Sequence, residues 1–389
     1  MMMARCQRSC GGCELTDRVE AVRGAERSLP LPPVEALDRA ATMLAVLQRV
    51  YNLSMSSLVN GRIFTVVTSV RLNLWDCFRV ALSCESEGMY SNAWVWYQQS
   101  LAMTSDPELS SFINGLVLSF AKRHDETWRP DENHLNDRMS SGNKLEVVRS
   151  TTLSACQYGI QKRSREGMMC HVSALGSAFL LLQPAKQEIL SLDPLIVMIH
   201  DAITNNQADQ LIDFANGTMA MDTYPERLTT FKLFTNNSHP VVEMMVRKVN
   251  YFTGLLTNNT ISTTELGDNK IRNYGAGGHI GRHVDVRYKH GRLNSSYLYT
   301  VGDRLLTCVF YLNKVTAGGS TNFFKLDLAV PPEKGSAVYF YNLKKNGDFD
   351  FRMYHSGCPV LLGSKWVGLK WVRENDNFLT YPCSLDPNV

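Results

Sequence analysis

In HSGCPVLLGSKWVGLKW, residues 355–371, two apolar runs are separated by a Gly-Ser turn. Runs of this length that are rich in Val, Leu and Trp and bounded by turn residues are typical of β-strands. We therefore expect a strand, a tight turn and an antiparallel return strand. This arrangement places Lys365, which opens the second run, across from the strand that His355 begins.

Similar β-rich runs recur through the C-terminal half, and Gly, Asn and Asp turns separate several of them. They include KIRNYG (270–275), HVDVRY (283–288), RLLTCVFYLN (304–313) and GSAVYFYNL (335–343). Many short strands at this spacing predict an antiparallel sandwich or barrel such as a jelly roll, a double-stranded β-helix. The segments DQLIDFANGT (209–218) and SHPVVEMMVRKVNYFTGLL (238–256) predict helices that flank it.

The N-terminal half has a helical pattern instead. Apolar residues in VEALDRAATMLAVLQRVYNL (34–53) recur three and four positions apart, which indicates one buried helix face. Two further helices fit VTSVRLNLWDCFRVALSCES (67–86) and SNAWVWYQQSLAMT (91–104). The fold class that follows is α+β, with an all-α region at 34–123 preceding the β-rich domain.

Two other segments lack such periodicity. Residues 1–33 contain C-x3-C-x2-C and LPLPP, and we interpret them as a disordered leader because no fourth metal ligand lies at zinc-like spacing. Pro, Asp, Asn, Ser and Gly cluster within 124–155, which predicts a linker. The β-rich domain therefore spans 156–389.

Composition excludes several classes of protein. Hydrophobic residues make up 44% and charged residues 20%, as in ordinary globular chains, and a net charge of +3 is too weak to indicate nucleic-acid binding. No apolar run reaches the roughly 18 residues that a transmembrane helix needs. The first residues show no signal peptide, whereas the ten cysteines and the N-x-S/T sequons favour the secretory pathway. The sequons are at Asn52, Asn216, Asn236, Asn258 and Asn294.

The sharpest chemical feature is His283-Val284-Asp285. In an extended strand, residues i and i+2 point to the same face, so the imidazole and the carboxylate would converge. With one more histidine they would form the 2-His-1-carboxylate triad that holds non-haem Fe(II) with open positions. The motif is weak by itself, and on spacing alone an exposed surface pair is the more common interpretation.

His355 strengthens the iron hypothesis as the candidate third ligand. Lys365, ten residues later, would then neutralise the far carboxylate of a bound dicarboxylic acid. The alternative for Lys365 is an exposed lysine at a strand end, which is the more common fate of lysine.

Several stretches of the C-terminal half resemble a known protein family. RNYGAGGHIGRHVD, GDRLLTCVFYLN, AGGSTNFF, PEKGSAVYFYNL, HSGCPVLLGSKWVGLKW and PCSLD resemble, in order and spacing, the catalytic domain of the prolyl 4-hydroxylase α subunit family. The resemblance implies an Fe(II)- and 2-oxoglutarate-dependent dioxygenase. It assigns the iron to His283, Asp285 and His355, the cosubstrate to Lys365, Tyr274, Thr307 and Arg373, and the substrate side to Arg304 and Trp371.

The resemblance further implies hydroxylation of peptidyl-proline in collagen-like or other proline-rich chains, with oxidative decarboxylation of 2-oxoglutarate to succinate. L-ascorbate would restore iron oxidised in uncoupled cycles. An endoplasmic-reticulum location, α-subunit dimerisation and a protein disulfide isomerase subunit are implied in the same way. So are two disulfides, Cys156–Cys170 and Cys358–Cys383.

More loosely, the N-terminal half resembles the dimerising and peptide-binding helices of the family. Tyr90, Trp94, Trp96 and Tyr97 would line a groove for polyproline II peptide. Aromatic residues at helical spacing are also typical of a plain core, which is the interpretation that we favour.

The sequence departs from the family pattern at two informative positions. Arg373 stands where many members have a histidine beside 2-oxoglutarate, and Ile280 stands where the family usually has a tyrosine. These departures leave two alternatives open. One is a non-catalytic or weakly active member that binds proline-rich peptide or a partner subunit, and the other is a dioxygenase for another substrate, such as peptidyl-lysine or a small molecule.

Overall fold

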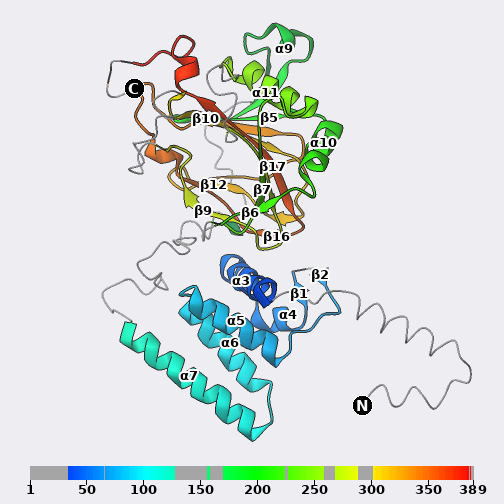
Figure 1. Cartoon of the computed structure of the whole chain (residues 1–389), viewed down its shortest axis with the longest axis vertical. Coiled ribbons are helices and arrows are strands. Elements are labelled where there is room, and N and C mark those ends of the chain that lie inside the picture. The colour runs from blue at the N-terminus through cyan, green and yellow to red at the C-terminus, as the bar shows by residue number, and fades with distance from the viewer. Residues whose placement is uncertain are drawn as a thin grey trace, which may run out of the picture.

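The computed structural model describes residues 34–64, 66–127, 156–157, 170–223, 227–257, 268–287, 301–384 and 386. The described chain is α+β, with helices first and a β-rich domain after them (Figure 1). The predicted leader lies outside the described residues, as does nearly all of the predicted linker. Helix α7 runs to Thr127, so the helical region extends past residue 123.

The N-terminal region consists of helices around a core of its own. A capping box starts α5, because the Asn73 side chain accepts from the backbone of Asp76 and the Asp76 carboxylate accepts from the Asn73 N–H. That cap explains why the helix begins well after residue 67. The elements are α3 (Val34–Tyr51), α4 (Met55–Val59), β1 (Arg62–Ile63), β2 (Val66–Val67), α5 (Leu74–Ser86), α6 (Tyr90–Ala102) and α7 (Pro107–Thr127).

Two of the four candidate groove aromatics belong to this core. Trp96 and Tyr97 are 0% and 1% exposed, and Trp96 Nε1 donates to Gln48 Oε1 at 2.6 Å. Trp94 is exposed and Tyr90 is half-buried. The core interpretation is therefore confirmed for Trp96 and Tyr97.

Antiparallel strands dominate the C-terminal domain. A nine-stranded sheet has the order β3-β4-β5-β14-β10-β17-β8-β7-β6, and a four-stranded sheet has the order β13-β12-β15-β9. The large sheet consists of β3 (Cys170–Ser173), β4 (Ala185–Leu192), β5 (Leu195–His200), β6 (Ala220–Met221), β7 (Thr230–Phe234), β8 (Asn269–Tyr274), β10 (Arg304–Tyr311), β14 (Ala337–Tyr341) and β17 (Lys365–Arg373). The small sheet consists of β9 (Ile280–His283), β12 (Thr321–Phe323), β13 (Leu328–Val330) and β15 (His355–Gly357), and β11 (Ala317–Gly318) pairs with β16 (Val360–Leu362).

The large and small sheets pack face to face. Phe323 of the small sheet meets Phe340 of the large one edge to face, with ring centroids 5.0 Å apart. Tyr311 Oη and Thr321 Oγ1 are hydrogen-bonded across the same interface at 2.9 Å. Side chains from both sheets thus form one buried core, and the residues discussed below lie between the sheets.

Helices back the large sheet. Helix α10 (Asn205–Ala215) starts with a capping box at Thr204, and α11 (Pro240–Thr253) ends at Gly254 in the left-handed conformation. A Cβ added to Gly368 of β17 would lie 3.0 Å from Met245 Sδ of α11, so the glycine lets the helix approach the sheet closely. Other helical segments among the described residues include the short α9 (Ala178–Leu182) and 3₁₀ turns at Phe351–Met353 and Asn375–Asn377.

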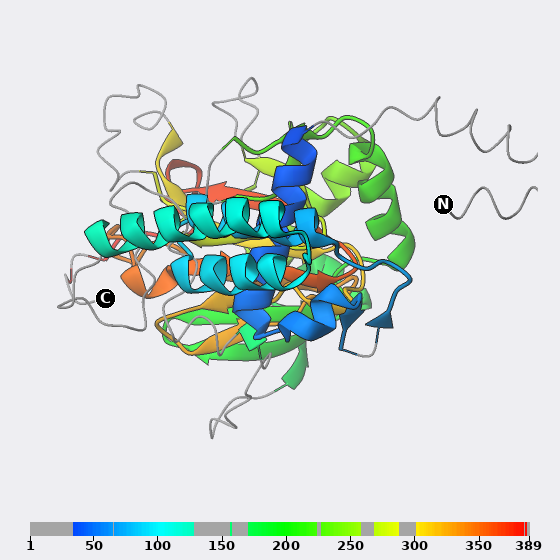
Figure 2. The same cartoon turned by 90° about the horizontal axis from the view of Figure 1, so that it is seen from below.

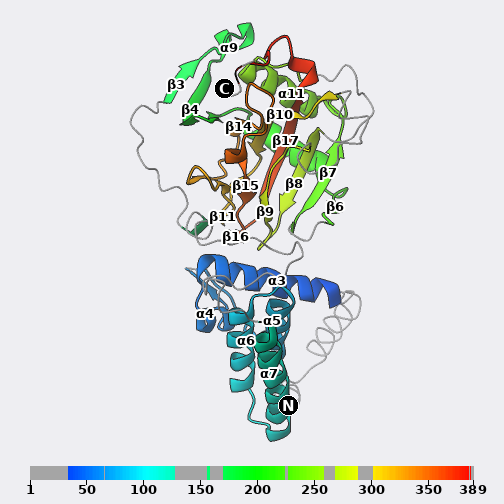
Figure 3. The same cartoon turned by 90° about the vertical axis from the view of Figure 1, so that its left-hand side faces the viewer.

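Helix α3 joins the two parts of the molecule. It lies across the end of the β-rich domain, beneath β16 in Figure 1 and beneath β11 and β16 in Figure 3. Figure 2 shows from below that it crosses under the sheets. Tyr51 Oη donates to the Pro359 carbonyl at 2.5 Å. A Cβ on Gly277 would lie only 2.6 Å from Met43 Cβ. The helical core continues into the β-rich domain through Cys358 and Leu361.

Most predicted strands are present, but two local predictions are wrong. The Gly-Ser turn does not form a hairpin: β16 pairs with β11, whereas β17 pairs with β8 and β10. The strand predicted at 283–288 is not present: β9 stops at His283, residues 284–287 belong to no strand, and Asp285 therefore lies beyond it. Tyr288 lies outside the described residues. Within the described residues, no helix combines the length and apolarity that a membrane crossing requires.

Candidate active site

Three potential metal ligands meet between the sheets. His283 ends β9 and pairs in register with His355 at the start of β15, which sets their ring centroids 4.3 Å apart. Asp285 completes the group: His283 Nε2 lies 3.8 Å from its Oδ1, and His355 Nε2 lies 3.8 Å from its Oδ2. All three donor atoms fall within 4.8 Å of one another.

Backbone carbonyls orient both imidazoles. His283 Nδ1 lies 2.9 Å from Gly281 O, and His355 Nδ1 lies 2.9 Å from Met353 O. A carbonyl oxygen only accepts hydrogen bonds, so each Nδ1 carries a proton, and in the neutral tautomer Nε2 has the free lone pair. Burial, and then the neighbouring His355, lower the pKa of His283, which keeps its imidazole neutral. Both rings are therefore prepared to bind a cation.

The carboxylate is held by a buried chain of hydrogen bonds. Thr307 Oγ1 donates to Asp285 Oδ2 at 2.7 Å, and Asn342 Nδ2 donates to Thr307 Oγ1 at 2.9 Å. Burial alone would raise the pKa of Asp285, but His355, His283, Arg304 and the Thr307 hydroxyl together lower it. Asp285 is therefore an anion. Thr307, which we expected beside the cosubstrate, contacts this carboxylate and does not line the cavity.

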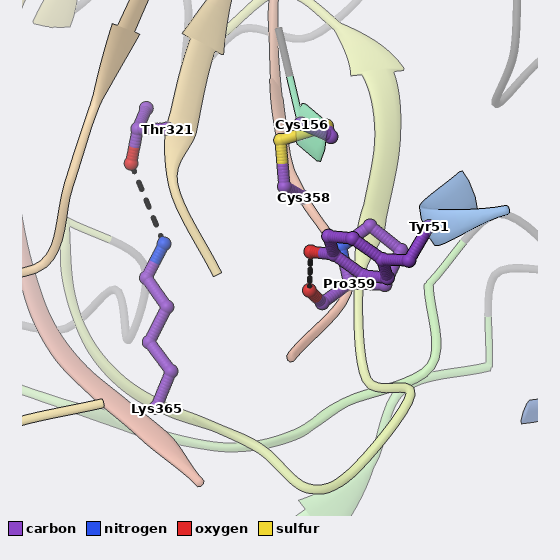
Figure 4. The surroundings of a disulfide bond; sticks show 6 residues. All are labelled: Tyr51, Cys156, Thr321, Cys358, Pro359 and Lys365. Carbon is purple, nitrogen blue, oxygen red and sulfur yellow. Dashed lines mark hydrogen bonds between the residues drawn. A yellow bond between two sulfur atoms is a disulfide. The ribbon is translucent and has the colours of Figure 1, made fainter. Parts of the chain in front are cut away.

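Lys365 and Tyr274 form a second group of polar side chains near the three potential metal ligands. They are cross-strand partners on β17 and β8, and the Lys365 ammonium lies 5.1 Å from the centre of the Tyr274 ring. Lys365 is 2% exposed, and its ammonium donates to Thr321 Oγ1 at 3.4 Å (Figure 4). Burial lowers the pKa of Lys365 to about 7. A buried lysine that pairs with no carboxylate among the described residues favours an incoming anion.

The residues of this site lie within a segment that matches a known protein family. Residues 270–373 match the 2OG-Fe(II) oxygenase superfamily, and that segment contains the two histidines, the aspartate, Lys365 and Tyr274. The chain carries a 2OG-Fe(II) oxygenase domain. The expected resemblance is confirmed by relatives that align over most of the chain.

Those relatives are prolyl 4-hydroxylase α subunits. Subunit alpha-2 of Caenorhabditis elegans is 28% identical over 92% of this chain and 75% of that protein. Subunit alpha-3 of Mus musculus is 26% identical over 96% and 80%, and subunit alpha-1 of Homo sapiens is 25% identical over 89% and 75%. Among solved structures, the 2OG complex of a viral collagen prolyl hydroxylase from Paramecium Bursaria Chlorella virus-1 is 21% identical, with a TM-score of 0.37, over 46% of this chain and 95% of that one.

The oxygenase domain encloses a cavity of about 600 Å³ that these groups line. Arg304 and Trp371, expected on the substrate side, both line it and lie against each other, with the guanidinium carbon 3.7 Å from the indole centre. Arg304 Nη1 also donates to the Asp285 carbonyl at 3.2 Å. The pair is therefore attached directly to the triad.

Arg373 does not reach this cavity. Its guanidinium makes a two-point contact with the Asp268 carboxylate, at 2.9 and 2.7 Å, and donates to the Gly302 carbonyl at 3.2 Å. Arg373 is 0% exposed and does not line the cavity. We expected it beside the cosubstrate, but the buried carboxylate of Asp268 holds it in a structural ion pair.

The cysteine pairing also differs from the expectation. Cys156 bonds to Cys358, with Cα atoms 5.6 Å apart, whereas Cys170 and Cys383 are exposed free thiols. The predicted pairs Cys156–Cys170 and Cys358–Cys383 are therefore wrong in this structure. Cys156 lies at the buried junction between α3 and the β-rich domain, where Cys358 precedes the carbonyl that Tyr51 contacts (Figure 4). Sequence spacing cannot identify such a long-range partner.

Several basic residues of the cavity were missed from the sequence. Besides Arg304 and Lys365, the lining includes Arg227, Lys270, Arg272, Arg282 and Arg287. Two of them had a usable signal. Lys270 and Arg272 precede Tyr274 by four and two positions on β8, so the period of a strand directs all three side chains to one face.

Proposed function

We propose that this chain is a 2-oxoglutarate-dependent dioxygenase that hydroxylates peptidyl-proline in collagen-like or other proline-rich polypeptides. One observation carries the proposal: His283, Asp285 and His355 converge in a cavity whose wall also presents Lys365. The names of the relatives point to proline as the substrate.

The donor set fits Fe(II). Two neutral imidazoles and one carboxylate are the ligands of the facial triad, and both imidazoles already present Nε2. Fe(II), when bound, would supply the oxygen activation that accompanies decarboxylation of 2-oxoglutarate to succinate. L-ascorbate would serve as the reductant that maintains the iron.

The protein's part is binding, orientation and exclusion of water. Lys365, with Tyr274 and Thr321 beside it, would bind the far carboxylate of 2-oxoglutarate as a charge-assisted pair. Val309, Val367 and Leu369 line the cavity with apolar surface that keeps water away from the reacting atoms. The Arg304–Trp371 pair would receive the peptide.

A turnover assay tests the proposal. The full chain, loaded with Fe(II), is given 2-oxoglutarate and a Pro-Pro-Gly-type peptide, and both succinate and peptide mass are followed. We expect succinate to form together with a product one oxygen atom heavier, with hydroxyl on proline. Succinate formation without any modified proline in a panel of proline-rich peptides would contradict it, and modified lysine would redirect it to another peptide substrate.

A second candidate is a non-catalytic member that binds proline-rich peptide. Two departures motivated it, and the placement of Arg373 removes one of them, since that side chain is engaged by Asp268 away from the cavity. Ile280 remains, because it does line the cavity. Retained peptide binding without succinate release would favour this candidate.

Further parts of the proposal concern architecture and setting. The face-to-face antiparallel sheets support a double-stranded β-helix, and a buried disulfide suits an oxidising compartment such as the endoplasmic reticulum. Dimerisation through the helices and a protein disulfide isomerase subunit follow from the likeness to the α subunits. Glycosylation at Asn236 is disfavoured, since its amide hydrogen-bonds to Thr257, Asn269 and Lys370.

A further inference from the structure

The lining of the cavity is strongly basic. Among the described residues, seven cationic side chains line it, against a single carboxylate, that of Asp285: Arg227, Lys270, Arg272, Arg282, Arg287, Arg304 and Lys365. Iron would add two positive charges to this surface, and 2-oxoglutarate would bring only two negative ones. The remaining excess of positive charge therefore calls for an anion from another source.

Most of these cations already have partners. Arg272 Nη1 binds the buried Asp222 carboxylate at 2.6 Å, and Arg227 lies 3.8 Å from the same group. Arg282 packs over the Tyr354 ring at 4.6 Å, and Arg304 covers Trp371. Arg287 is exposed, and Lys365 is assigned to 2-oxoglutarate. Among the remaining cations, Lys270 is the one that shares the Trp371 indole with Arg304.

Lys270 makes no hydrogen bond or ion pair with any described residue. Its ammonium lies 4.5 Å from the centre of the Phe231 ring and 5.6 Å from that of Trp371, so Lys270 and Arg304 both lie against one indole. Trp371 Nε1 is buried and has no acceptor in the described part of the chain. Burial, followed by repulsion from Arg272, lowers the pKa of Lys270 to about 7, a repulsion that a bound anion would relieve.

The backbones of Lys270 and Lys365 lie well apart along the sheet. Lys365 pairs across the sheet with Tyr274, and Lys270 lies four residues before Tyr274 on β8. Four residues of strand span roughly 13 Å, more than the separation of the carboxylates in a five-carbon dicarboxylate. Lys270 thus belongs to the Arg304–Trp371 end of the cavity, where the peptide would enter.

We propose that Lys270, beside Trp371, forms a carboxylate subsite that selects peptides bearing an acidic group next to the target proline. The inference rests on the proposed function and deepens it. The carboxylate belongs either to an Asp or Glu side chain one or two residues from the proline or to the end of a short peptide. Arg304 donates to the Asp285 carbonyl and covers the Trp371 ring that Lys270 also faces, so the subsite lies close to the triad.

Four peptides test this with the full chain. Three have blocked ends and carry Glu, Gln or Lys directly before the proline. The fourth is the Gln peptide with a free C-terminal carboxylate next to the proline. We expect kcat/KM for the Glu peptide to exceed that for the Gln peptide about tenfold, the scale of one charge-assisted contact. A comparable gain for the fourth peptide would identify the chain end as the source.

Variants of Lys270 locate the effect. Lys270→Gln should bring the Glu/Gln ratio to near one, and Lys270→Glu should reverse the preference towards the Lys peptide. Lys186→Gln is the matched control, because Lys186 is 62% exposed and pairs with Asp201; it should leave the ratio unchanged. An unchanged ratio in Lys270→Gln, with no reversal in Lys270→Glu, would overturn the subsite.

Binding measurements test the carboxylate subsite separately from the proposed hydroxylation. Fluorescence anisotropy with labelled peptides gives Kd without turnover, and Lys270→Gln should weaken the Glu peptide selectively. Hydroxylation of all peptides at equal efficiency, with equal Kd, would defeat only the subsite. Selective binding of the Glu peptide without hydroxylation would uphold the subsite and defeat the proposed reaction.

Discussion

At the scale of single residues, the two imidazoles lie opposite each other because His283 and His355 are register partners on β9 and β15. Replacing His283 with Ala should weaken Fe(II) binding by more than the roughly 10–100-fold that loss of a ligand's hydrogen-bond partner produces. Metal titration of the purified variant measures it. His171→Ala is the control, since His171 is exposed on β3. Undiminished iron affinity would refute the ligand assignment.

Thr307 orients the carboxylate without touching the cavity. Thr307→Val keeps the shape of the side chain but removes the hydrogen bond to Asp285 Oδ2 and leaves Asn342 Nδ2 without that acceptor. We expect metal affinity to fall by roughly 10–100-fold while the circular dichroism spectrum stays the same. A variant with normal metal affinity would show that Asp285 needs no such support.

Lys365 should make cosubstrate binding pH-dependent. Its pKa is lowered to about 7 without ligand, and a bound carboxylate favours the charged form, so binding takes up a proton as pH rises above 7. The affinity for 2-oxoglutarate should therefore be greatest below pH 7 and decline up to about tenfold per pH unit above it. Calorimetry from pH 6 to 9 measures the decline, which Lys365→Met should abolish together with most of the affinity.

At the scale of elements, the close approach of α3 to the loop after β8 can be tested at Gly277. Its φ of +71° and the 2.6 Å that would separate an added Cβ from Met43 both disfavour alanine, so Gly277→Ala should destabilise the chain by roughly 1–3 kcal/mol. Gly217→Ala is the control: its φ is +78°, but no atom of the described residues lies within 4 Å of the added Cβ. Equal losses in denaturant titrations would mean that the docking contact contributes nothing.

Some elements could be predicted from the sequence, and the sheet to which each belongs could not. Strands β8, β10, β14 and β17 of the large sheet and helices α10 and α11 were predicted, because their periodicity and turn residues are local. Strands β3 to β7 of the same sheet were not predicted. The sheet to which each strand belongs was not predictable, as β16 and β17 demonstrate: a Gly-Ser turn serves equally as a hairpin or as a crossing between sheets. The ligand histidines were found through motifs, whereas the environment of Arg373 depended on Asp268, 105 positions away in sequence.

At the scale of the whole molecule, the Cys156–Cys358 bond closes a loop with a sequence separation of 202. Loop entropy for that length corresponds to roughly 5 kcal/mol, an upper value because native strain and residual structure reduce it. Cys156→Ser should lower the melting temperature and make it insensitive to reductant. Cys383→Ser, at an exposed free thiol, should leave it unchanged. A melting temperature unaffected by Cys156→Ser would contradict the pairing.

The contact between the helices and the β-rich domain limits how independently the two parts of the molecule can change. His355 opens β15, and only four positions later the carbonyl of Pro359 receives the Tyr51 hydroxyl, while Cys358 between them is tied to Cys156. The segment that carries a candidate iron ligand is thus also the segment on which the helices rest. Exchanging the helical half for that of another protein would remove the contacts that hold this segment next to His355, so the two halves are constrained to change together.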